Sequence, residues 1–174
     1  MVFLNNLRIA LLAAWLGIAI YFSAAVAPSA FKLLRSFSVA NPAEIAGSIV
    51  TRTLFVVNVS GVLVSLLLLV TVLIVRERLP RWVIVSQSLL LIVVAVATSA
   101  GEWIIASRMR GLRLAMHGQI DQLPVTDPNR MAFAALHGYS VAALGIAIIA
   151  GLIALLIMAG ISCRTERNTA VGNL

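Results

Sequence analysis

The residues of this chain that could do chemistry are few, and they lie at a similar distance from the basic ends of its long apolar segments. A helix rises about 1.5 Å per residue, and we count this rise from the arginine at the far end of each segment. On this count, one such residue in each of the four segments lies about 27 to 40 Å along the helix axis. The shared depth predicts one polar layer made by all four segments. Its members are Pro28, Asn58, Glu102, Arg130, His137 and Ser140.

Glu102 and His137 are the members of this layer that could carry a proton or hold a cation. Glu102 is the only charge in its segment. We expect either a carboxylate at the lipid headgroups, which snorkels or pairs with a nearby arginine, or a proton- or cation-binding group with Arg130 or Arg52 as its resting partner. His137 is either a hydrogen-bonded interfacial residue or an acid–base partner of Glu102. Arg130 and His137 are seven residues apart and therefore share one helix face.

Motifs for other chemistry are missing from the sequence. It contains no H-E-x-x-H pattern, no glycine-rich phosphate loop and no nucleophile elbow, so we assign no catalytic residue and no metal site. Cys163 is the only cysteine, which rules out an intrachain disulfide and a thiolate cluster. Two histidines, both outside the apolar core, do not favour haem ligation, and we expect no cofactor.

The composition is that of a membrane protein. Of the 174 residues, 61% are hydrophobic and 11% are charged, whereas about a quarter are charged in a soluble domain. The net charge of +7 comes mainly from arginines at the ends of apolar runs, where they report membrane topology rather than nucleic-acid binding. A soluble enzyme and a nucleic-acid partner are therefore excluded.

The fold predicted is all-α: one domain, residues 1–174, with four transmembrane helices in an antiparallel bundle. A helix of roughly 20 apolar residues crosses the bilayer, and helices satisfy their own backbone hydrogen bonds there. Asn41-Pro42 and Asp127-Pro128 are typical helix starts, so the second and fourth helices should begin before their membrane portions and protrude on the side of the long connections. The spans predicted are about 9–31, 53–75, 82–107 and 131–163, followed by a short basic tail, 164–174.

Small residues predict where the helices pack closely. Lipid does not drive helices together by the hydrophobic effect, so small side chains at the contact are favoured. Such stripes occur on three helices: Ala13 and Gly17; Asn58, Gly61 and Ser65; Ala143, Ala147 and Gly151. We expect contacts within the bundle or with a partner, including a second copy of the chain.

Basic residues orient the chain weakly. They number six on the side of the termini and seven on the side of the long connections, but the short turn at residues 76–81 carries the densest cluster. Under the positive-inside rule this cluster favours an inner (plasma) membrane protein with both termini in the cytoplasm.

Three stretches of the sequence carry short motifs in a fixed order. The first span carries Trp15-Leu16-Gly17, Tyr21-Phe22 and Ala27-Pro28-x-x-Phe31; the second helix starts with Ala46-Gly47-x-Ile49-Val50; the fourth carries Arg130-x-x-Phe133-x-x-Leu136-His137-x-x-Ser140. In their order and spacing these motifs resemble the transmembrane protein 205-like family, a domain of unknown function. The likeness runs roughly from Leu11 to Met158. It implies a polytopic, four-helical protein without an established activity.

Two functional hypotheses follow. The first is a non-enzymatic membrane protein that binds or helps pass a small solute or ion, or scaffolds a membrane complex, at the polar layer. The alternative is a membrane redox or quinone-binding module that uses Glu102 and His137 as a pair.

Overall fold

Four long helices make up the protein in the computed structural model, which describes residues 2–37, 41–75, 79–116 and 122–171. The first runs through α1 (Val2–Tyr21), a π-helical turn η1 (Phe22–Val26) and α2 (Ala27–Ser36). The second is α3 (Pro42–Val75). The third consists of α4 (Arg81–Ser99), the π-helical η3 (Ala100–Ala106) and α5 (Ser107–Ala115), and the fourth is α6 (Pro128–Val171).

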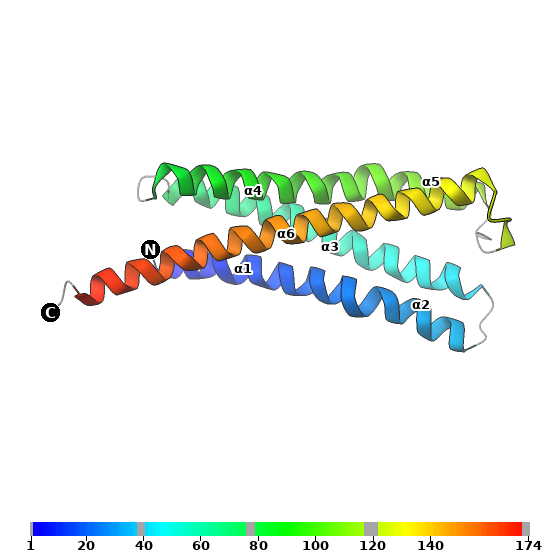
Figure 1. The fold of residues 1–174 in the computed structure, drawn as a ribbon, viewed down its shortest axis with the longest axis horizontal. Coiled ribbons are helices and arrows are strands. Elements are labelled where there is room, and N and C mark those ends of the chain that lie inside the picture. Colours follow the sequence, from blue (N-terminus) through cyan, green and yellow to red (C-terminus); the bar gives the residue numbers. More distant parts are fainter. Residues whose placement is uncertain (1, 38–40, 76–78, 117–121, 172–174) are drawn as a thin grey trace.

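The predicted fold class is confirmed. All four helices are long and apolar enough to cross a membrane, and they form an antiparallel bundle with both chain ends on one side (Figure 1). Large apolar side chains such as Leu63, Val96 and Ile149 point out of the bundle, more than half exposed. Exposed leucine and isoleucine in such number suit lipid rather than water, as expected for a multi-pass membrane protein.

Both predicted helix starts are found. The backbone carbonyl of Asn41 accepts hydrogen bonds from the amides of Glu44 and Ile45, and Asn41 adopts a φ of 54°. Asparagine tolerates this left-handed conformation better than most residues. At the start of α6, the Asp127 carboxylate accepts hydrogen bonds from the amides of Asn129 and Arg130, at 2.8 and 3.2 Å. α3 and α6 thus begin at Pro42 and Pro128, directly after Asn41 and Asp127, as predicted.

The middle of the bundle is closely packed around Trp15. Its indole nitrogen donates to the carbonyl of Val57 at 3.1 Å, and the side chain is 2% exposed. A Cβ added at Gly61 would lie 2.9 Å from both Trp15 and Thr98, and one added at Gly151 would lie 3.1 Å from Trp15. Only glycine lets the helices approach this closely, as two of the small-residue stripes predicted.

The third stripe faces outward. Ala13 and Gly17 are exposed on α1, and a Cβ at Gly17 would meet nothing within 4 Å. The expected helix contact therefore does not form among the residues that the structure describes.

We expect Gly61→Ala to lower the free energy of unfolding by about 1–3 kcal/mol, because the new methyl group forces the hydrogen-bonded indole to move. Gly145→Ala is the matched control, since Gly145 has open space around it and alanine is the better helix former by up to about 1 kcal/mol. Thermal unfolding of the two variants in the same detergent measures the difference. Equal stability of the two variants would contradict the close packing at Gly61.

Two π-helical turns interrupt the helices at about the same height. In the first, the amide of Ala27 donates to the carbonyl of Phe22, five residues back. Pro28 follows at once, and its ring would clash with a carbonyl four residues back in a regular α-helix. The wider turn relieves this clash and redirects α2. The second, η3, contains Glu102.

Beyond these turns the bundle separates into two pairs of helices. α2 packs on α3, and α5 packs on α6, but contacts between the two pairs are sparse there. Figure 1 shows α2 leading away from α6 toward the long connections. The protruding end of the bundle is therefore open between the pairs.

Candidate functional site

A cavity of about 550 Å³ fills the opening between the two helix pairs. All four helices contribute to its walls, which run from Leu54 to Pro42 on α3, about 18 Å at the helical rise per residue. The exposed arginines Arg52 and Arg108 lie beside its inner end, next to Leu54 and Ala106. Exposed arginine marks the headgroup layer, so the cavity extends outward from that layer.

The walls are apolar at the inner end and charged toward the outer end. The main apolar wall residues are Phe22, Phe31, Val50, Leu54, Phe133 and Leu144. Three arginines and one glutamate provide the charges: Arg35, Arg110, Arg113 and Glu44. A cavity of this size with a few polar groups has the character of a small-molecule site.

Arg113 stands at the centre of the charged part. Its guanidinium lies 5.6 Å from the centroid of the Phe133 ring, a cation–π distance, and a Cβ at Gly47 would come within 2.7 Å of it. Glu44 interacts with it electrostatically. The buried Nε atom of Arg113 has no hydrogen-bond partner, so a donor remains unused at the cavity wall.

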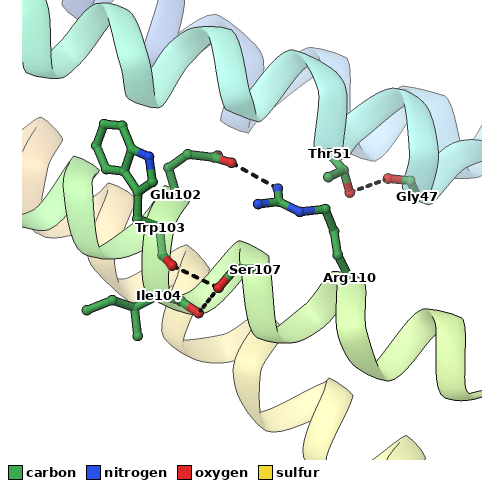
Figure 2. A network of polar contacts seen from close by, with 7 residues as sticks. All are labelled: Gly47, Thr51, Glu102, Trp103, Ile104, Ser107 and Arg110. Carbon is green, nitrogen blue, oxygen red and sulfur yellow. Dashed lines mark hydrogen bonds and ion pairs between the residues drawn. The ribbon is translucent and has the colours of Figure 1, made fainter.

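Glu102 lies one turn below the cavity wall and is 2% exposed. Its Oε1 atom pairs with Nη1 of Arg110 at 2.9 Å, and Figure 2 shows the two side chains pointing toward each other beside α3. The expectation that Arg130 or Arg52 is its partner is therefore wrong. The reason is the π-helical turn: hydrogen bonds five residues back insert one residue, so that positions eight apart lie two turns apart on one face.

The second carboxylate oxygen of Glu102 is buried without a hydrogen bond. The Asn58 side chain lies next to this turn, with its Nδ2 atom 3.3 Å from where a Cβ of Gly101 would be. Asn58 is itself 2% exposed. Glu102 and Asn58 thus lie together under the cavity, as the common depth predicts.

Three further predicted residues line the cavity: Pro28 on α2, and His137 and Ser140 on α6. Ser140 is 7% exposed, and its hydroxyl makes no hydrogen bond with the described residues. The other buried hydroxyls of the described residues, on Ser65, Thr71 and Thr98, each donate to a backbone carbonyl of their own helix. His137 is more exposed and has no hydrogen bond or ion pair among the described residues.

Arg130 is the predicted site residue that the structure places elsewhere. Its guanidinium donates to the carbonyl of Leu123 and so ties down the connection before α6. It is not among the described residues that line the cavity. His117, expected at the surface, lies outside the described residues.

The sequence model for a domain of unknown function, DUF4149, matches residues 10–118. The chain belongs to this family. The DUF4149 match covers the first three helices, including Pro28, Asn58 and Glu102, and ends before α6. No curated protein and no solved structure matches the chain. The DUF4149 family itself supplies no activity, so the function has to be argued from the cavity.

Charged residues of the cavity were the part of the site that sequence reasoning missed. Arg35, Arg113 and Glu44 read as solvated charges at a membrane boundary, since nothing in their spacing shows that two helix pairs separate there. The available signal was the surplus of arginine beside aromatic residues on protruding helices.

Sequence reasoning also missed a polar contact near the termini. Arg8 is 2% exposed, and its Nη2 atom donates to the Oε1 of the buried Gln87 at 2.8 Å. An arginine at the start of a span reads as a boundary marker, whereas this one reaches into the bundle between α1 and α4.

Proposed function

We propose that this DUF4149 protein binds a small solute in the cavity between its helix pairs, on the side of the long connections, without acting as an enzyme. The observation that carries the proposal is the cavity itself, with apolar walls, the buried and unpaired Nε atom of Arg113, and the Ser140 side chain. A buried donor left without a partner in the wall of a cavity indicates a site that a ligand can complete.

Binding has more support than passage through the chain. Gly61, whose close contacts with Trp15 and Thr98 fill the bundle interior, lies two turns beyond the last α3 residue of the cavity wall. This packed layer closes the cavity toward the membrane centre. A solute would therefore enter and leave on the same side unless the helices rearrange.

The redox alternative has less support from the geometry. It needs Glu102 and His137 as a pair, but Glu102 is engaged with Arg110 below the wall while His137 lines the cavity. No ion pair or hydrogen bond joins their side chains among the described residues. A quinone ring could still lie against the aromatic wall. A quinone bound there would slow the labelling of a thiol placed in the cavity, as any other solute that fills it would.

We keep two finer assignments as part of the proposal. The resemblance to the transmembrane protein 205-like family rests on the motifs around Pro28, Gly47 and His137. The basic short turn supports cytoplasmic termini in a plasma membrane, which would put the cavity on the opposite face. A solute would then come from outside the cytoplasm.

A thiol placed in the cavity tests the proposal. Ser140→Cys, made in a Cys163→Ala background and reconstituted in lipid nanodiscs, should react with a small neutral maleimide and be slowed by a solute that fills the cavity. Ala154→Cys, at a 0% exposed position of the packed bundle, is the matched control and should stay unreactive. Equal, negligible reaction at both positions would show that the cavity is closed to solutes and would overturn the proposal.

A further inference from the structure

The charges on the cavity wall select among ligands. Three arginines face one glutamate there, so the wall attracts anions. Arg110 already shares its charge with Glu102, and Arg113 with Glu44. Arg35 has no ion pair within the part of the chain that the structure describes. Arg35 and Arg113 are therefore the groups most available to an anionic ligand.

The apolar part of the wall sets a second requirement for the ligand. Phe22, Leu54 and Leu144 lie at the inner end of the cavity, while Arg35 and Arg113 lie toward its outer end. A cavity of about 550 Å³ lies within the range of about 300–1,000 Å³ typical of small-molecule sites, which suits a ligand of one hydrocarbon chain with a head group. A ligand that satisfies both ends has one apolar chain and one anionic head.

The polarity of the cavity runs in the same direction as that of the lipids in the adjoining leaflet. Lipids there carry their heads outward and their chains toward the membrane centre, and the cavity has its charged end outward and its apolar end inward. Its inner end is level with the exposed arginines Arg52 and Arg108, in the headgroup layer, and few contacts join α2 to α6 on that side. An amphiphile that moves outward from the leaflet, head first, would enter the cavity without turning over.

We propose that the cavity binds a single-chain anionic amphiphile from the adjoining leaflet, with its carboxylate or phosphate head between Arg35 and Arg113 and its chain along the aromatic wall. This inference rests on the proposed solute-binding function and adds the chemical class of the solute.

Protection of the Ser140→Cys thiol tests the class of ligand. In nanodiscs of zwitterionic lipid, dodecanoate should slow maleimide labelling at a membrane concentration about tenfold lower than dodecanol, because charge-assisted hydrogen bonds to the head distinguish the two. Acetate, which has the head without the chain, should give no protection. Equal protection by dodecanoate and dodecanol would overturn the anionic class while leaving solute binding intact.

Charge variants locate the head group. Arg35→Gln and Arg113→Gln should each raise the dodecanoate concentration needed for protection about tenfold and leave dodecanol unchanged. Glu44→Gln should lower it, since the variant removes a negative charge from the wall. Arg113→Lys keeps the positive charge that Arg113→Gln removes. A comparison of these two variants therefore separates the effect of losing the charge from the effect of changing the structure.

Arg108→Gln is the matched control, as Arg108 is exposed and is not among the cavity residues that the structure describes. If Arg35→Gln, Arg113→Gln and Arg108→Gln all give the wild-type preference for dodecanoate, the arginines do not hold the head and the proposal is wrong. An absence of protection by any of these compounds, with the thiol still reactive, also overturns it. A thiol that does not react at all instead overturns the proposed function.

Discussion

In Arg110→Gln, we expect the free energy of unfolding to fall by about 2 kcal/mol, the largest loss of any single change near the cavity. The variant leaves the Glu102 carboxylate, whose side chain is 3% exposed, without its cation. Removing one partner of a fully buried pair costs about 3–5 kcal/mol. The Arg110 side chain is 48% exposed and partly screened by solvent, which reduces that figure.

The reciprocal change should cost less. Glu102→Gln removes the buried charge and leaves Arg110 able to reach solvent, so we expect a loss of about 1 kcal/mol or less. The double variant Glu102→Gln/Arg110→Gln should recover most of the stability that Arg110→Gln loses. Thermal unfolding in one detergent compares the three variants, with the exposed Arg108→Gln as control within about 0.5 kcal/mol of wild type.

This asymmetry distinguishes a buried carboxylate from one at the lipid surface. If Glu102 reached the headgroups, both single variants would cost little and the double variant would show no coupling. Strong coupling supports the pairing across the π-helical turn. Glu102→Gln has a second consequence, because it frees the Arg110 guanidinium at the cavity wall and should strengthen dodecanoate binding.

Most of the fold could be predicted because its determinants are local. Apolar runs of the length of a bilayer define the four spans, and Asn41-Pro42 and Asp127-Pro128 mark helix starts that the structure confirms. Glycine at Gly61 and Gly151 predicts close packing for a similar reason: the property lies in the residue itself. The outward-facing Gly17 shows the limit, since small size does not reveal which neighbour a helix face meets.

The candidate site was predicted only in part because its geometry depends on irregular turns. Depth counted at a constant rise brings Pro28, His137 and Ser140 to one level, and all three line the cavity. The partner of Glu102 could not be found in this way, because a regular helix puts positions 102 and 110 about 80° apart around its axis. The π-helical turn that aligns them has no signature in the residues Ala100–Ala106 comparable to the proline after the first one.

At the opposite end of the bundle, Gln87→Leu should lower the free energy of unfolding by about 2–3 kcal/mol. Arg8 would lose the hydrogen bond of 2.8 Å that its Nη2 atom donates, and its Nε atom already has no partner. A hydrogen bond to a charged group contributes about 1.5–3 kcal/mol, and no ion pair replaces it within the described residues. Val85→Leu, at a 63% exposed position of the same helix, is the control and should change little.

Replacing both partners should reverse the loss. In Arg8→Met/Gln87→Leu the buried charge is gone and two apolar side chains fill its place, which is often neutral or stabilising in a protein interior. Thermal unfolding measures all three variants, and a double variant no more stable than Gln87→Leu would show that Arg8 does not depend on the amide. Because the cavity lies at the other end of the bundle, dodecanoate protection of the Ser140→Cys thiol should be the same in the double variant as in wild type, so that stability and ligand binding can be altered independently.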